Sequence, residues 1–78
     1  MWLKEYNISF YAYQYCKNFK HDQKIMKRIT NSYWAYQYCR CVRDRPEVRK
    51  HITDSRDAYF YCLNIRDDPK MRKIWEED

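Results

Sequence analysis

Ala35-Tyr36-Gln37-Tyr38-Cys39 is the segment that organises this chain, because it occurs three times at a fixed spacing. It occurs 23 residues earlier as Ala12-Tyr13-Gln14-Tyr15-Cys16, and 23 residues later as Ala58-Tyr59-Phe60-Tyr61-Cys62. A period this short is typical of proteins that stack equivalent supersecondary units. The functional question is therefore which surface of the stack binds a partner.

The repeat extends beyond these five positions. A serine stands three residues before each alanine, and a basic residue stands eight residues after it. Asp44 and Pro46 recur one period later as Asp67 and Pro69. We therefore divide a single domain, 1–78, into a leading half-unit and three repeats: 1–6, 7–29, 30–52 and 53–78.

Each repeat is predicted to form two short helices joined by a tight turn. The repeated serine (Ser9, Ser32, Ser55) is expected at the N-cap of the first helix, where its hydroxyl accepts from an unpaired backbone N–H. A tyrosine beside the apolar stripe is expected to insert between units (Tyr15, Tyr38, Tyr61). The stripe itself follows helical spacing: Ala12, Cys16 and Phe19, then Ala35, Cys39 and Val42, then Ala58, Cys62 and Ile65.

The second helix is expected to begin at Pro46 and Pro69, since proline lacks only an N–H that is unpaired at this position in any case. An aspartate before it (Asp22, Asp44, Asp67 or Asp68) would cap the helix. Its buried pairs would be Ile25 with Ile29, Val48 with Ile52, and Met71 with Trp75. These patterns predict an all-α fold, a small α-solenoid of three helix-turn-helix repeats with a leading half-repeat, whose ends Trp2, Tyr6 and Trp75 close.

Composition narrows the chemistry. Sixteen basic and eleven acidic residues give a net charge of +5, which favours an anionic partner. No apolar run is long enough for a membrane span and no signal-peptide pattern begins the chain, so we expect a cytoplasmic protein. The repeated cysteines are interpreted as reduced and buried, with a disulfide framework as the alternative. His21 and His51 stand at non-equivalent positions, and we expect neither a metal nor a cofactor.

The chain resembles the short α-helical repeats, a little over twenty residues long, of phage and bacterial proteins without assigned activity. The resemblance rests on Ser32-x-x-Ala35-Tyr36-x-Tyr38-Cys39, on Asp44-Arg45-Pro46-Glu47-Val48-Arg49-Lys50, and on the matching third copy. It implies a phage-encoded protein that acts on a host factor in the bacterial cytoplasm. The motif assigns no chemistry of its own.

Aromatic residues that do not recur in every copy are candidates for partner binding. Phe10 and Tyr11 match Tyr33 and Trp34, whereas the third copy has Arg56 and Asp57 at these positions. A position that accepts both tryptophan and aspartate is expected to lie outside the core. The four aromatic residues are therefore predicted to form an exposed patch, with an edge packed by the half-unit as the alternative.

A ladder of basic residues is the second candidate. Equivalent positions carry Lys20, Arg43 and Arg66 in one row and Lys27, Lys50 and Lys73 in another, with Lys17 and Arg40 beside the first row. Either these side chains keep the stack soluble, or they bind phosphates of a nucleic acid or an acidic protein face. The tyrosines that recur in every copy, Tyr13, Tyr36 and Tyr59, are interpreted as packing residues. In the nucleic-acid alternative, Tyr13 and Tyr36 would stack on bases, since they stand near Lys17, Lys20, Arg40 and Arg43 along the helix.

No catalytic constellation is found. The chain contains no glycine for a phosphate loop, and its two histidines do not pair with a nucleophile. We expect a non-enzymatic protein-interaction module, an inhibitor that sterically blocks a host defence nuclease, in the manner of an anti-CRISPR protein, or a polymerase. Binding of nucleic acid or a nucleotide along the ladder is the alternative, and self-association through the aromatic N-terminal face is a third possibility.

Overall fold

The structure is a computed structural model that describes residues 2–76 and, of these, the side chains of residues 4–76. All regular structure in this range is helical, so the prediction of an all-α fold is confirmed. The helices are α1 (Trp2–Asn18), α2 (Gln23–Met26), α3 (Ser32–Cys41), α4 (Pro46–Arg49), α5 (Ser55–Asn64) and α6 (Pro69–Glu76).

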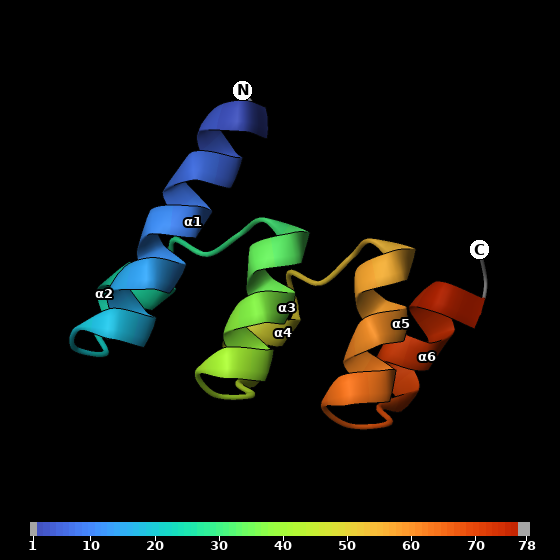
Figure 1. The fold of residues 1–78 in the computed structure, drawn as a ribbon. Helices are drawn as coiled ribbons and strands as arrows, with labels where there is room; N and C mark the ends of the chain where they lie inside the picture. The colour runs from blue at the N-terminus through green and yellow to red at the C-terminus, as the bar shows by residue number, and fades with distance from the viewer. Residues whose placement is uncertain (1, 77–78) are drawn as a thin grey trace.

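The helices form three pairs arranged in a row. The longer helices α1, α3 and α5 lie side by side, and each is followed by its partner, α2, α4 or α6 (Figure 1). Contacts join α1 to α3 and α3 to α5, as well as the two members of each pair. The row measures 34 × 26 × 16 Å, and the two termini lie toward its opposite ends. Each pair therefore contacts only its neighbours in the sequence.

The predicted serine N-caps are wrong. Asn31 caps α3 by accepting from Trp34 N, and Asp54 caps α5 by accepting from Arg56 N. Ser9 lies in the middle of α1, which begins at Trp2 and runs continuously across the boundary between the half-unit 1–6 and the first repeat. An Asn or Asp one residue before the serine is as good a cap as serine itself, and it leaves the hydroxyl free for another role.

That role is to hold the connection to the next helix pair. The buried Ser9 Oγ accepts hydrogen bonds from the backbone N–H groups of Thr30 and Asn31, both at 3.0 Å. Ser32 Oγ repeats the arrangement with the N–H groups of Thr53 and Asp54, at 3.0 and 3.1 Å. Each serine thus pairs donors at the start of the following helix, which would otherwise lack a partner.

Replacing Ser9 or Ser32 by Ala is expected to lower the free energy of unfolding by about 1–2 kcal/mol, because two backbone donors lose their acceptor. Ser55 is the matched control, since within residues 4–76 its hydroxyl makes no hydrogen bond of this kind. Ser55→Ala should therefore change stability by less than about 0.5 kcal/mol. Urea unfolding of the three variants measures the difference, and equal effects at the three sites would contradict this role.

The second helices begin where prolines predict. Pro46 and Pro69 are the first residues of α4 and α6. Asp22 caps α2, and Asp68 accepts from the backbone of Lys70 and Met71. Asp44 does not cap α4, because Arg45 occupies the N-cap and makes no side-chain cap there. Asp67 is an exposed residue in the turn before α6.

The core follows the repeated stripe, but Phe19 is exposed and several residues predicted to be buried, Ile25 and Trp75 among them, are only half-buried. The alanines and cysteines at the predicted positions of α1 and α3 are buried, as is Ala58, whereas Cys62, Val42 and Ile65 are half-buried. Phe19 was predicted to be buried and is 79% exposed, because α1 ends at Asn18 and the ring lies beyond the helix. In the second helices Ile29, Val48, Ile52 and Met71 are buried, and Met26 is buried where Ile25 is only half-buried.

The repeated tyrosines behave as predicted where a preceding helix pair exists. Tyr38 and Tyr61 are fully buried, and their hydroxyls reach His21 and Asp44 of the preceding pair, at 2.6 Å and 2.7–2.8 Å. Tyr15 occupies the same position in the first repeat, has no pair before it, and is 38% exposed. The side chain of Trp2, expected to close this end, lies outside the described side chains.

Candidate protein-interaction surface

Trp34 is not the exposed residue that the sequence predicts. It is half-buried and packs against the core. Its ring lies 4.9–5.5 Å from the rings of Phe10, Tyr13 and Tyr6 on α1, and 4.8 Å from that of Tyr33. Trp34 therefore fills the space between α1 and α3, and the role expected for it as an exposed binding residue has to be corrected.

The tolerance of this position for aspartate has a specific cause. Asp57 is the equivalent residue of the third repeat. It is half-buried between α3 and α5, where it accepts a 2.8 Å hydrogen bond from Ser32 Oγ. Burial raises the pKa of Asp57, and the Ser32 hydroxyl counteracts part of this rise. Trp34 and Asp57 thus occupy equivalent interfaces between helix pairs. Trp34 packs in an aromatic cluster, and Asp57 accepts a hydrogen bond.

The four predicted patch residues are neighbours, since the Phe10 ring lies 5.6 Å from that of Tyr11 and 4.9 Å from that of Trp34, which in turn contacts Tyr33. Their exposed rings, however, face different hollows. Phe10 is half-buried beside Trp34. Tyr11, 69% exposed, lines a groove between α1 and α2, whereas Tyr33, 42% exposed, lines a separate hollow with Asp57 and α5. The exposed aromatic surface is therefore divided between two places.

The groove between α1 and α2 is the larger and more apolar of these surfaces. Its volume is about 420 Å³, and Lys24 and Arg28 stand among the residues that line it. On the α1 side it meets a row of exposed apolar side chains, which we call the α1 stripe: Ile8, Tyr11 and Tyr15 on α1, and Phe19 in the turn directly after it, whose ring lies 5.7 Å from that of Tyr15.

The α1 stripe has helical spacing, with steps of three, four and four residues. The stripe was missed because α1 has a second apolar row, Ala12 and Cys16, which is the buried one. Only Tyr11 was among the predicted binding residues. The sequence did contain a signal for this stripe, because α1 has apolar residues on two faces. One apolar face is enough to pack against a core, so the second indicated an additional surface.

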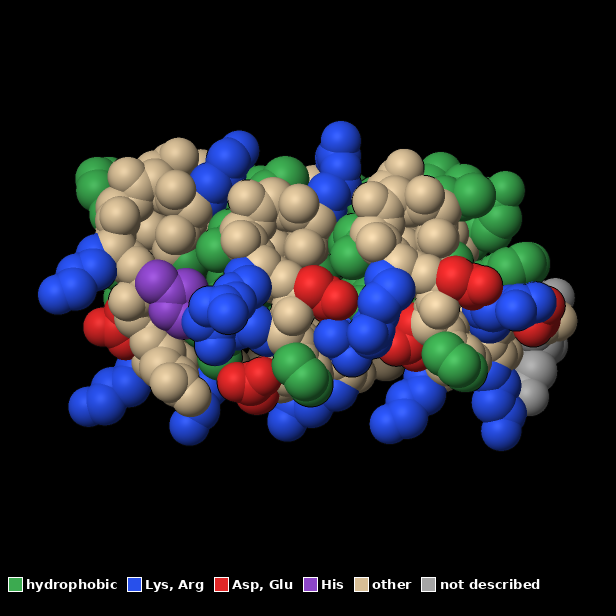
Figure 2. Space-filling view, turned by 90° about the horizontal axis from the view of Figure 1, so that it is seen from below, with side chains coloured by type: hydrophobic (Ala, Val, Ile, Leu, Met, Phe, Trp, Pro, Cys, Tyr) green, Lys and Arg blue, Asp and Glu red, His purple; other side chains and the backbone are tan. Residues whose placement is uncertain are grey.

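The eight residues of the basic ladder are all exposed. Lys20, Arg43 and Arg66 lie in the turns that end the first helices. Figure 2 shows one face of the molecule, on which basic side chains extend along the whole row of helices with acidic ones between them. The second row lies elsewhere: Lys27 and Lys50 follow the far ends of α2 and α4, and Lys73 lies within α6. The ladder is thus two rows, one before and one after the start of the second helices.

The tyrosines expected to stack on bases are not accessible. Tyr13 and Tyr36 are 4% and 5% exposed. The Lys17 ammonium lies 5.6 Å from the centre of the Tyr13 ring, and burial together with a hydrogen bond to Cys41 raises the pKa of Tyr13 to about 12. The interpretation of these rings as a base-stacking platform is therefore wrong, because the next helix pair covers them.

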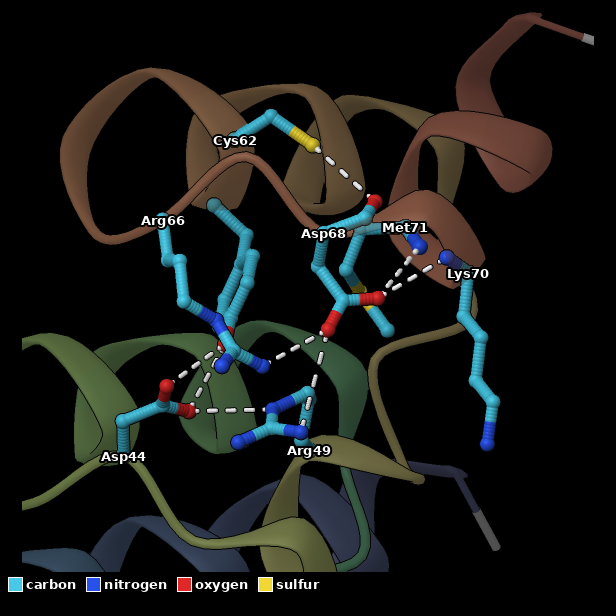
Figure 3. Close-up of polar contacts among 8 residues, drawn as sticks. Asp44, Arg49, Cys62, Arg66, Asp68, Lys70 and Met71 are labelled. Carbon is cyan, nitrogen blue, oxygen red and sulfur yellow. Dashed lines mark hydrogen bonds and ion pairs between the residues drawn. The ribbon is translucent and has the colours of Figure 1, made fainter.

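A polar network joins the second and third helix pairs. Tyr61 donates to Asp44, Arg49 Nε bonds the same carboxylate at 3.0 Å, and Arg49 Nη1 lies 3.8 Å from Asp68 (Figure 3). Arg66 completes the network through a 2.8 Å contact with Asp68. The Arg49 guanidinium also lies 5.8 Å from the centre of the Tyr61 ring. Asp44, expected to cap a helix, instead fixes how one pair sits on the next.

The pKa shifts in this network agree with its contacts. Burial alone would raise the pKa of Asp68, but the N–H groups of Met71 and Lys70 and the guanidiniums of Arg66 and Arg49 hold it below its ordinary value. Burial and the hydrogen bond to Asp44 raise the pKa of Tyr61. The carboxylate of Asp68 therefore stays ionised and the phenol of Tyr61 stays neutral near neutral pH, which makes the network a structural element.

The interface between the first and second helix pairs has different residues at the positions of the ion pair. His21 stands where the second repeat has Asp44, and Met26 stands where it has Arg49. The His21 Nε2 lies 2.6 Å from the Tyr38 hydroxyl, and Met26 is buried. Both members of the ion pair are thus exchanged together, so that no charge is left without its partner.

The four cysteines are free. Cys16 and Cys39 are buried as predicted, and burial raises the pKa of the Cys39 thiol to about 12, which keeps it protonated and unreactive. Cys41 is exposed. Among the residues whose side chains are described, no group of three or more His, Cys, Asp or Glu side chains is arranged to hold a metal ion.

Comparison with known proteins gives no relationship. No protein-family model matches the chain, and no curated protein or solved structure is significantly similar to it. Within residues 2–76, no helix has both the length and the apolar character that crossing a membrane requires. The function is therefore argued from the surfaces alone.

Proposed function

We propose that the chain is a short α-solenoid, three helix-turn-helix repeats in a row, that works as a non-catalytic protein-interaction module. The binding surface is the groove between α1 and α2 with the α1 stripe beside it. The observation that supports this most is the exposure of three large apolar side chains in helical register on α1, with a fourth, Phe19, just past its end, beside an apolar groove. Contiguous exposed apolar surface of this kind marks interaction sites.

The module acts sterically. Aromatic anchors such as Tyr11 and Phe19 enter the partner's surface, while the basic side chains, which carry the net charge of +5, speed its approach to an acidic protein. The resemblance to phage helical repeats supports a phage-encoded inhibitor whose partner is a host protein, a defence nuclease or a polymerase. Occlusion of the host factor then requires no chemistry from this chain.

Replacing Tyr11 and Phe19 together by Ala is expected to reduce capture of the host partner at least about tenfold, because both anchors leave the interface. The thermal midpoint should stay within about 2 °C of the wild type, since both rings are mainly exposed. Affinity capture from bacterial lysate, with quantitative mass spectrometry of the bound proteins, measures the first quantity, and a thermal melt measures the second.

The matched control is Leu63→Ala with Phe60→Ala on α5, which also removes two exposed apolar side chains (60% and 45%) but at the other end of the row. This variant should capture the partner as the wild type does. Equal loss in both variants would show non-specific hydrophobic adhesion, and retention in the α1 variant would place the binding surface elsewhere.

Nucleic-acid binding is the alternative, and the exposure of all eight ladder residues supports it. Because binding to phosphates releases counterions, affinity should fall steeply with salt, with a slope that reflects about three to five phosphate contacts. Gel shifts with single- and double-stranded DNA and RNA at two salt concentrations test this expectation. The absence of a shift at low salt would eliminate it.

A further inference from the structure

The last helix pair, α5 and α6, exposes side chains whose equivalents in the first two repeats are covered by the following pair. Tyr13 and Tyr36 are covered by the following helix pair, the first by Trp34 at 5.3 Å and the second by a 2.9 Å hydrogen bond from Asn64. Tyr59 is the equivalent residue of the third repeat and is 41% exposed. Trp75, which follows the buried Ile29 and Ile52 in the repeat, is likewise only half-buried.

The N-terminal end is the complementary half of the same interface. Tyr38 and Tyr61 are fully buried against the preceding pair, whereas Tyr15 is 38% exposed along the groove between α1 and α2. Ile25 is half-buried there, although its equivalents Val48 and Met71 are buried. The groove between α1 and α2 therefore corresponds to the surface that a preceding helix pair covers in the second and third repeats. We call this surface the seat.

We propose that this seat receives the α5–α6 pair of a second copy of the chain, so that copies join head to tail. The inference rests on the proposed function, since it assigns a ligand to the same groove. The proposal is supported by the interfaces inside the chain. The seat on the first helix pair and the exposed side of the last pair are the same two surfaces that pack together between successive repeats.

Specific contacts follow from this register. Tyr61 donates to Asp44 and lies beneath Arg49. Across the junction Tyr15 takes the place of Tyr61, and Asp67 and Arg72 of the second copy take the places of Asp44 and Arg49.

The carboxylate of Asp67, which would accept the hydrogen bond from Tyr15, already has the ion-pair partner that Asp44 has. Asp67 pairs with Arg72 at 3.6 Å, just as Asp44 pairs with Arg49, and the side chain of Asp67 is 67% exposed. Tyr11 would likewise lie on Tyr59, as Trp34 lies on Tyr13. The two surfaces differ from each other, so the association is heterologous, and each junction leaves one seat and one free end for further copies.

Sedimentation velocity over a range of concentrations tests the proposal. The wild type should form species larger than a dimer as concentration rises. Tyr15→Ala and Asp67→Arg should each weaken association at least about tenfold, because each removes one side of the same hydrogen bond, and the arginine at position 67 also brings a cation toward Lys24 and Arg28 of the seat. Tyr11→Lys, at an aromatic position of the seat that is 69% exposed, provides a second N-terminal variant should Tyr15→Ala fail to fold.

Mixing the variants tests the polarity. Tyr15→Ala keeps an intact C-terminal end and Asp67→Arg keeps an intact seat, so the mixture should form a one-to-one dimer that grows no further. A wild type that stays monomeric at its highest soluble concentration, variants that associate as the wild type does, or a mixture that stays monomeric would each overturn the proposal.

The same variants separate this inference from the proposed function. Asp67→Arg leaves the α1 stripe intact and should still capture a host partner. Capture without any self-association would overturn only the head-to-tail junction. Self-association without capture of a host protein would overturn only the host-directed function.

Discussion

Replacing Trp34 by Ala is expected to lower the free energy of unfolding by about 3 kcal/mol, toward the lower end of the range for large-to-small aromatic substitutions because the ring is half-buried. The Trp34 ring contacts four aromatic neighbours at the junction of α1 and α3. The cavity left by its removal would weaken the contact between the first helix pair and the second. For a chain of this length the thermal midpoint should fall by on the order of 10–20 °C. Circular dichroism melts measure it.

Two controls identify the cause. Trp34→Phe keeps most of the ring contacts and removes the Nε1–H group, which is buried without a hydrogen-bond partner, so it should cost less than about 1 kcal/mol. Tyr33→Ala removes a neighbouring ring that is 42% exposed and should also cost little. An unchanged midpoint for Trp34→Ala would mean that the residue is not part of the core contact.

Replacing Arg49 by Met is expected to lower the free energy of unfolding by about 2 kcal/mol. The substitution leaves Asp44 and Asp68, both partly buried, without the cation between them. Removing one partner of a fully buried pair costs about 3–5 kcal/mol, and the 17% and 24% exposure of the Arg49 and Asp44 side chains reduces this figure. Chemical denaturation at low and high salt measures the loss.

The chain contains its own rescue for this variant. The first interface carries His21 and Met26 where the second carries Asp44 and Arg49. Adding Asp44→His to Arg49→Met should therefore restore most of the lost stability, because Tyr61 regains a histidine partner of the kind that Tyr38 has. Additive losses in the double variant would show that the two networks are not interchangeable.

The repeat pattern predicted the parts of the fold that depend on local chemistry. Pro46 and Pro69 begin helices because the constraint lies within the proline ring. Ala12, Ala35 and Ala58 are buried because only a small side chain lets neighbouring helices approach closely, which every copy requires. The burial of Tyr38 and Tyr61 followed from the same reasoning.

The errors arose where two residues compete for one role or where a neighbour decides burial. Ser32 and Asn31 are both suitable caps, and only the position of the next connection shows that the serine binds that connection instead. Trp34 and Asp57 share a sequence position, yet their surroundings differ because one meets α1 and the other meets Ser32. Substitution patterns within the chain therefore gave a false indication of exposure.

The linear sequence was enough to establish the order of the helices, the starts of α4 and α6, and most of the faces that pack, because periodicity and proline act over a few residues. The location of the proposed binding surface depended on three-dimensional packing. Tyr15 and Tyr38 are chemically identical and occupy the same place in their repeats, but one is open to solvent and the other is buried. The difference is whether a helix pair stands before them, since a stack buries every interface except the two at its ends.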